Sequence, residues 1–192
     1  YFKGIYLFPV NEIKNAVFRW IKFTGNFKMD NLKIVSGYAF VYSTFSGELS
    51  LPVCTQIGAY AFGSSNFSGS LNLPVCELIE FSAFVSSNFS GELILPVCTQ
   101  IGSNAFLYSN FSGSLNLPAC TQIGDSAFRN SNFSGSLDLP VCTYIGGYTF
   151  ENSNFNKITI GANAVLGGGG YCIGAHSTEF IADYTANGKL AG

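Results

Sequence analysis

The sequence has few of the residues on which most protein chemistry depends: it holds one His, one Met and one Trp among 192 residues. Charged side chains make up only 10% of the chain and the net charge is -2, which excludes the basic surface typical of nucleic-acid-binding proteins. No run of about 18 apolar residues exists, so no segment is predicted to span a membrane as a helix. Apolar residues make up 47%, which excludes general disorder.

What the sequence has in abundance is an internal repeat of 22 residues. Two phenylalanine columns keep this step, and so do five of the six prolines and five of the six cysteines. The repeated unit is NFSGxLxLPxCxxIGxxAFxxS. Its most regular columns are Phe40, Phe62, Phe84, Phe106, Phe128 and Phe150; Phe45, Phe67, Phe89, Phe111, Phe133 and Phe155; and Cys54, Cys76, Cys98, Cys120 and Cys142.

The repeat weakens toward both ends of the chain. Phe18 lies one period before Phe40, and Ile158 matches Leu137 if one residue is deleted. End repeats have one face without a neighbour, so they are expected to differ and to cap the stack. We therefore predict one continuous solenoid domain of about seven to eight coils, with a degenerate N-terminal part over 1–44, five regular repeats over 45–155, and a last coil with a cap or tail over 156–192.

Each unit combines a short strand with two turns. Leu71-x-Leu73 alternates as a strand does, and Pro74 ends it because proline lacks a donor N–H. The spacing of Ile101, Ala105 and Phe106 fits a single helical or 3-10 turn. Stacked copies then give a parallel β-sheet on one face and short turns, 3-10 turns or helical turns on the other. The buried core is expected to contain Phe62, Phe67, Phe84, Phe89, Phe106, Phe111, Cys76, Cys98 and Cys120.

The motif LxLPxCTxIGxxAF resembles the BspA-like class of leucine-rich repeats, whose units read LxxLxLPxxLxxIxxxAFxxC over 23 residues. The copies LSLPVCTQIGAYAF, LNLPVCELIEFSAF and LILPVCTQIGSNAF carry this resemblance, which extends over roughly residues 1–166. The sequence departs from the family pattern in several features: the unit has 22 residues, its Cys lies in the LxLxxC slot instead of after Ala-Phe, and Ser lies three residues before the first strand Leu, with a core Phe four before it. The resemblance implies a leucine-rich repeat solenoid on a bacterial surface or secreted protein, of a kind often implicated in adhesion.

The cysteine column is interpreted as a row of buried free thiols, which behave as small apolar side chains. A spacing of 22 in a stack places cysteines in a line, whereas zinc needs ligands that converge. Disulfides between adjacent coils stay possible by distance. A second column, made of Asn66, Asn88, Asn110 and Asn132, matches the glycosylation sequon, but a polar ladder with the neighbouring serines is the favoured interpretation.

No catalytic, cofactor or metal site is predicted. His176 is alone, and a nucleophilic mechanism needs a positioned base and an orienting group. Cys172 lies four residues away in a glycine-rich loop, and Gly167–Gly170 lacks the context of a phosphate-binding fingerprint. In the tail after this loop, Phe180 and Ile181 are the expected anchors of a cap.

The outward residues of the predicted sheet form the candidate binding face, because repeat proteins bind partners on extended surfaces of this kind. These columns are small and polar, which favours weak, multivalent contacts over a single tight site. Charge is also uneven: residues 1–44 carry six basic and two acidic side chains, and residues 45–155 carry one basic and seven acidic. Tyr60, Tyr108, Tyr144 and Tyr148 are expected on the opposite, turn side as a rival surface. The candidate face consists of Glu48, Ser50, Ser70, Asn72, Glu92, Ile94, Ser114, Asn116, Ser136 and Asp138.

Two functional hypotheses follow. The first is a non-enzymatic extracellular or cell-surface protein that adheres to a protein or glycan of a host or of a neighbouring cell. The second is a structural spacer or stalk with no ligand of its own, which the bland exposed columns also suit. No signal peptide is visible and the chain begins at Tyr1, so we interpret it as a mature or trimmed form.

Overall fold

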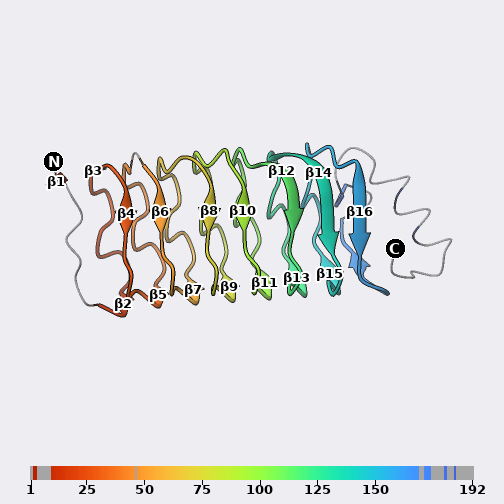
Figure 1. Ribbon diagram of the computed structural model, residues 1–192, viewed down its shortest axis with the longest axis horizontal. Coiled ribbons are helices and arrows are strands. Elements are labelled where there is room, and N and C mark those ends of the chain that lie inside the picture. Colours follow the sequence, from red (N-terminus) through yellow and green to blue (C-terminus); the bar gives the residue numbers. More distant parts are fainter. Residues whose placement is uncertain are drawn as a thin grey trace.

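The 22-residue repeat winds into an elongated solenoid whose coils lie side by side from the N-terminal to the C-terminal end (Figure 1). The computed structural model describes residues 2–3, 10–45, 47–168, 171–173, 180 and 184. All strand pairs within these residues are parallel, and in the regular repeats each strand pairs with its copy 22 residues away. The predicted solenoid fold is therefore confirmed.

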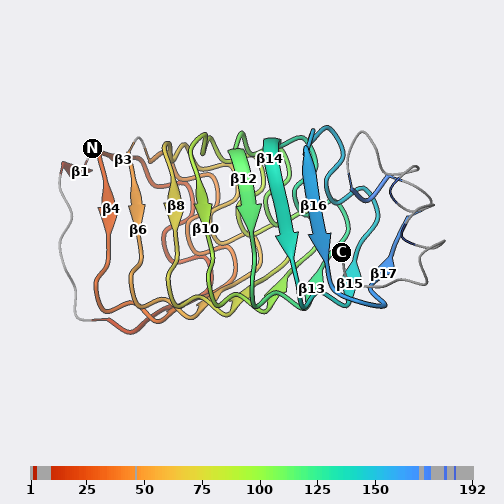
Figure 2. The same ribbon diagram turned by 45° about the vertical axis from the view of Figure 1, so that its right-hand side comes forward.

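One face of the solenoid is the predicted row of leucine strands, which we call the leucine sheet (Figure 2). A four-stranded segment and a three-stranded segment follow one another along this face. The chain turns after each strand at the proline, which has no N–H to continue the ladder. The strands are β4 (Phe27–Lys28), β6 (Leu49–Ser50), β8 (Leu71–Asn72), β10 (Leu93–Ile94), β12 (Ser112–Asn116), β14 (Asn132–Leu139) and β16 (Lys157–Ile160).

A second parallel sheet, which the sequence analysis did not predict, forms from the segment that ends in the repeated isoleucine. We call it the isoleucine sheet; it has eight strands in the described residues. Each strand has only two residues, with the second one turned into the core. Its strands are β2 (Glu12–Ile13), β5 (Ile34–Val35), β7 (Gln56–Ile57), β9 (Leu78–Ile79), β11 (Gln100–Ile101), β13 (Gln122–Ile123), β15 (Tyr144–Ile145) and β17 (Val165–Leu166), and the separate pair β1 (Phe2–Lys3) and β3 (Phe23–Thr24) lies near the N-terminal end.

The remaining side of each coil is a six-residue turn. The described part of the chain has seven such turns, and none of them is helical. Of the predicted alternatives, the protein therefore adopts short turns. In the turn 59–64 the N–H groups of Tyr60, Phe62 and Ser64 donate to carbonyls of the next coil at 2.8–3.0 Å. The intervening N–H groups donate three residues back within the same coil. This division keeps both sets of buried backbone groups paired. The turn side consists of residues 15–20, 37–42, 59–64, 81–86, 103–108, 125–130 and 147–152.

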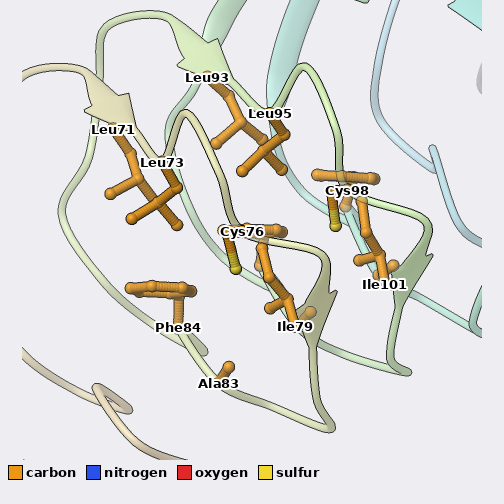
Figure 3. Close-up of a cluster of buried hydrophobic side chains, with 14 of the residues drawn as sticks. Leu71, Leu73, Cys76, Ile79, Ala83, Phe84, Leu93, Leu95, Cys98 and Ile101 are labelled. Atoms are coloured by element: carbon orange, nitrogen blue, oxygen red, sulfur yellow. The ribbon is translucent and has the colours of Figure 1, made fainter. Parts of the chain in front are cut away.

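The core is a set of side-chain columns in which each type contacts its own copies (Figure 3). Leu71, Leu73, Cys76, Ile79 and Phe84 of one coil lie against the equivalent residues of the next and have no exposed surface. All nine residues expected in the core, from Phe62 to Cys120, are completely buried. Burial of this repeated set is what holds coils together that are too short to be stable alone.

The phenylalanines form two stacked columns that also contact each other edge-on. Phe84 and Phe106 stack at 5.3 Å between ring centroids with planes 3° apart. Phe84 meets Phe89 of the second column at 5.9 Å and 74°. Such aromatic pairs are worth about 0.5–1.5 kcal/mol beyond the burial of their area.

A polar ladder runs beside the second phenylalanine column. Ser87 is fully buried, and its hydroxyl donates to the Phe84 carbonyl at 2.7 Å and lies 3.2 Å from the Ser109 hydroxyl. On the surface next to it, the Asn88 amide donates to the Asn66 side chain at 3.2 Å. These bonds form part of the polar ladder that the sequence favours for the Asn-Phe-Ser motif, with the asparagine step found between Asn66 and Asn88.

Candidate functional site

The ten residues of the candidate face come together as two outward columns on the leucine sheet. They lie on, or directly before, strands β6 to β14, and strand register aligns Ser50 with Asn72, Asn72 with Ile94, and Asn116 with Asp138. Seven of the ten are exposed, and Ser50, Ser136 and Asp138 are half-buried. The face is therefore accessible, and its residues are regularly spaced along the solenoid. Its role as a binding surface is not tested by this arrangement and stays a prediction.

Hydrogen bonds between coils occupy part of this face. The Ser70 hydroxyl accepts a bond from the Glu92 N–H at 3.0 Å, and the Ser114 hydroxyl accepts one from the Ser136 N–H at 2.9 Å. No hydrogen bond within the described chain engages the side chains of Asn72 or Asn116. Each of these side-chain amides therefore has two N–H donors and a carbonyl acceptor that are not used within the described chain.

The isoleucine sheet carries a second candidate surface, an open groove of about 440 Å³. Its floor includes Gly102 and Gly124, and adjacent strands present Gln100 and Gln122 side by side, with Tyr144 on the next strand. This groove was not predicted from the sequence, although Gln recurs before the buried Ile at Gln56, Gln100 and Gln122, which is a signal for an outward column. Backbone groups of the floor are paired within the sheet, as in the 2.8 Å bond from the Gly124 N–H to the Ile101 carbonyl, so a peptide cannot add there as a further strand.

The tyrosines predicted on the turn side divide between two surfaces. Tyr60, Tyr108 and Tyr148 lie in turn segments, with Tyr60 half-buried and the other two exposed. Tyr144 instead lies on strand β15 of the isoleucine sheet, which corrects its predicted position. The error arose because a two-residue strand is too short to show alternation in the sequence.

All six cysteines are buried free thiols, in agreement with the favoured interpretation of their column. Burial raises the pKa of the Cys98 thiol to about 12 and that of Cys54 to about 11, because a thiolate would lose its hydration. The Cys98 thiol also lies 3.4 Å from the Gln100 carbonyl, as a donor. Such thiols are poor nucleophiles, since reactivity needs the thiolate.

We expect the cysteines of the native protein to resist thiol reagents at neutral pH and to react fully in denaturant. The reason is that each is buried and protonated in the fold and is exposed with a pKa of about 8.5 after unfolding. Labelling with Ellman's reagent, with and without urea, measures this directly. Rapid reaction of all six in native buffer would contradict the buried column.

No catalytic constellation is found in the parts of the chain that the structure describes. There, no three His, Cys, Asp or Glu side chains gather in an arrangement that could hold a metal ion. Cys172 is buried with a raised pKa, at about 11. His176 and residues 169–170 of the glycine-rich loop lie outside the described residues. No helix within the described ranges is long and apolar enough to cross a membrane.

Phe180 and Tyr184 form an aromatic pair that follows the last described coil. Phe180 is half-buried and stacks on Tyr184 at 5.9 Å. The buried Tyr184 hydroxyl donates to the Gly161 carbonyl and accepts from the Ala164 N–H, both at 2.8 Å. Phe180 thus contributes to the cap as expected, Tyr184 was missed, and Ile181 lies outside the described residues.

The family model for the BspA-type leucine-rich repeat region matches the chain in six copies, over residues 11–134 and 99–169. No curated protein and no solved structure matches it.

Proposed function

Because the chain belongs to the BspA-type leucine-rich repeat family, we propose that it is a non-enzymatic adhesion protein of the cell surface or extracellular space, which holds a protein or glycan against one face of its solenoid. Solenoids of leucine-rich repeats typically serve as interaction scaffolds. The candidate face is the outward surface of the leucine sheet, with Asn72 and Asn116 as its principal contacts.

The observation that carries this proposal is the fixed spacing of uncommitted polar groups on an accessible face. Asn72 and Asn116 lie two coils apart, on β8 of the four-stranded segment and on β12 of the three-stranded segment, and each is in register with its copy on one neighbouring strand, Ile94 and Asp138. A partner with repeating polar groups can engage several coils at once. Individually weak contacts then add through a high effective concentration, which suits adhesion between large objects.

The spacer hypothesis keeps support from the same face. Its exposed residues include few of the Trp, Tyr and Arg side chains that dominate tight protein interfaces. A rigid elongated stack would hold a neighbouring domain at a distance without binding anything. Binding to the sheet face and the spacer role therefore make opposite predictions for a ligand screen.

We expect the protein to bind at least one member of a panel of matrix proteins and glycans, and we expect the double substitution Asn72→Ala with Asn116→Ala to weaken that binding about tenfold or more. Two lost amide contacts of about 0.7 kcal/mol each account for this factor. Surface plasmon resonance on the immobilised panel measures the change.

The matched control is Gln100→Ala with Gln122→Ala, which removes two amides from the groove of the isoleucine sheet. If only this control loses binding, the site lies in the groove and not on the leucine sheet. If the unmodified protein binds nothing in the panel, the spacer role is favoured.

A further inference from the structure

The turn side has an unusual backbone that every coil repeats. Two positions in each of the seven turn segments have φ between 52° and 69°, the left-handed region that L-residues other than Asn and Asp rarely occupy. The first set is Ala16, Tyr38, Tyr60, Ser82, Asn104, Ser126 and Tyr148, and the second is Trp20, Tyr42, Ser64, Ser86, Tyr108, Asn130 and Asn152. Asn and Ser occupy seven of these positions, so the left-handed backbone does not require a bulky side chain.

Bulky aromatic residues nevertheless occupy six of these fourteen positions, and four of the six lie in the first three turn segments. A large side chain in this conformation is strained, and burial does not compensate the strain, since Trp20 is 63% exposed. Tyr38 and Tyr42 are exposed as well. Exposed aromatic side chains at strained positions are the pattern expected of a binding surface.

Trp20 offers one open aromatic face beside a cation. Its indole stacks on Tyr42 with centroids 4.4 Å apart and planes 18° apart, so one face is covered. The Arg19 guanidinium lies 5.6 Å from the Trp20 centroid and 5.9 Å from that of Tyr42, which places it beside the pair. The exposed surface of the Trp20 side chain is therefore mainly on the indole face that points away from Tyr42.

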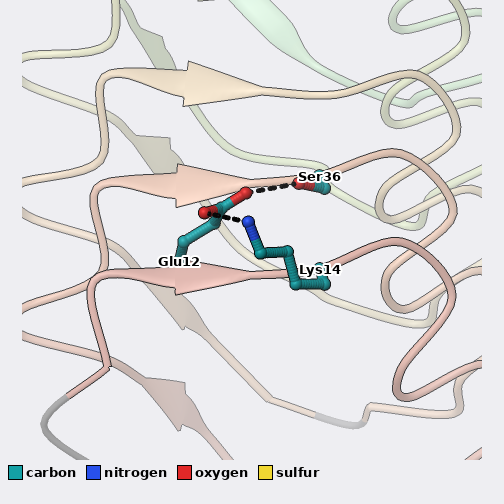
Figure 4. Close-up of polar contacts among 3 residues, drawn as sticks. All are labelled: Glu12, Lys14 and Ser36. Atoms are coloured by element: carbon teal, nitrogen blue, oxygen red, sulfur yellow. Dashed lines mark hydrogen bonds and ion pairs between the residues drawn. The ribbon is translucent and has the colours of Figure 1, made fainter.

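The charge around this pair is positive and uncompensated. Residues 10–45 carry five basic and two acidic side chains. Both acids are already paired, Glu12 with Lys14 and Ser36 (Figure 4) and Asp30 with Lys28. No ion pair to Arg19 or Lys22 is found among the described residues. Residues 47–168 carry seven acidic and two basic side chains, so the N-terminal end is the part of the described chain that attracts anions.

We propose that Arg19, Trp20, Lys22 and Tyr42 form a binding site for an acidic oligosaccharide. The weakly positive C–H groups of a pyranose ring pack against the negative face of the indole. A carboxylate or sulfate on the same sugar pairs with Arg19, whose planar donors match such an anion, and Lys22 adds charge. Arg19, Trp20 and Tyr42 are on the turn side, and Lys22 follows the turn of Trp20 by two residues. The site is therefore separate from the candidate face of the leucine sheet and does not depend on it.

Other anionic partners fit the four residues less well. An acidic peptide pairs with Arg19 and Lys22 but leaves the indole face without a matching flat group. An anionic bilayer needs several apolar side chains that insert together, and Val17 is the only large aliphatic residue that is exposed in the same turn. A sugar acid combines a flat apolar face with a charged edge, as the site does.

The experiment uses the fact that Trp20 is the only tryptophan of the chain, so its fluorescence reports on this site alone. Short hyaluronan and heparin oligosaccharides should change the emission saturably, and added salt should weaken the effect. Neutral chitohexaose, polyglutamate and phosphatidylserine vesicles serve as comparisons. A stronger response to polyglutamate or to vesicles than to both acidic sugars would overturn the proposal in favour of that partner, and no response to either sugar would overturn it outright.

Substitutions then separate binding from structure, with anisotropy of a labelled oligosaccharide as the readout. Arg19→Gln and Trp20→Asn should each weaken binding about tenfold or more, and asparagine suits the left-handed backbone, as at Asn130. Tyr108→Asn is the matched control, because Tyr108 is in the same column and 56% exposed. Full binding by both site variants would refute the site, and if Trp20→Asn does not fold, Arg19→Gln decides. The Asn72→Ala, Asn116→Ala protein should bind the sugar normally.

Discussion

Replacing Phe89 with alanine should lower the free energy of unfolding by about 3–5 kcal/mol. Phe89 is completely buried, and it stacks on Phe67 at 5.9 Å and on Phe111 at 5.5 Å. Its edge contact with Phe84 joins the two aromatic columns. The substitution removes the transfer free energy of the ring, leaves a cavity, and interrupts the column in the middle of the stack.

Urea unfolding followed by circular dichroism measures this loss. Because each coil contacts only its neighbours, a weakened central coil should also broaden the transition. Phe81→Ala is the control in the same coil: its side chain is 42% exposed, and we expect a change below about 1 kcal/mol. Equal midpoints for the two variants would show that the column does not carry the stability assigned to it.

The second large effect is a loss of stability at alkaline pH. Burial raises the pKa of all six thiols in the fold, to about 11 for Cys54 and Cys172 and about 12 for Cys98. In the unfolded chain their pKa is about 8.5. As pH rises above about 8.5, the unfolded state releases protons that the folded state retains, so the equilibrium shifts toward unfolding. The contribution of the protonated, buried thiols to the free energy of unfolding is fully present below about pH 8.5 and is lost progressively as the pH rises toward about 11.

The free energy of unfolding should fall steeply with pH, because each such thiol contributes about 1.4 kcal/mol per pH unit between its unfolded and folded pKa values. Six such thiols together should make this loss of free energy large compared with the stability of a typical domain, about 5–15 kcal/mol. Melting curves between neutral pH and about pH 10.5, with reductant present, test this. The double variant Cys76→Ala with Cys120→Ala should reduce the thiol part of the slope by about a third, whereas an unchanged slope would assign the effect to other groups.

Several features of the candidate surfaces could not be predicted from the sequence, for two reasons. A strand of two residues has no visible alternation, so the isoleucine sheet, its groove and the position of Tyr144 were not predicted. The left-handed turn positions depend on hydrogen bonds to carbonyls of the next coil, which lie about 22 residues away in the chain. The contact between Trp20 and Tyr42 arises from that geometry, and nothing in the local sequence of either residue indicates it.

The amino-acid sequence alone was sufficient to predict the 22-residue period, the parallel stacking and the residues of the buried columns. Identical units bury the same side chains, so the apolar residues that recur at one step, such as Phe84 and Cys98, could be assigned to the core without coordinates. The tertiary structure decided which polar groups of the candidate face are not bonded within the protein. The Ser70 hydroxyl is hydrogen-bonded to the next coil, whereas the Asn72 side chain is not. This difference depends on atomic positions in neighbouring coils, which a repeated sequence pattern does not reveal.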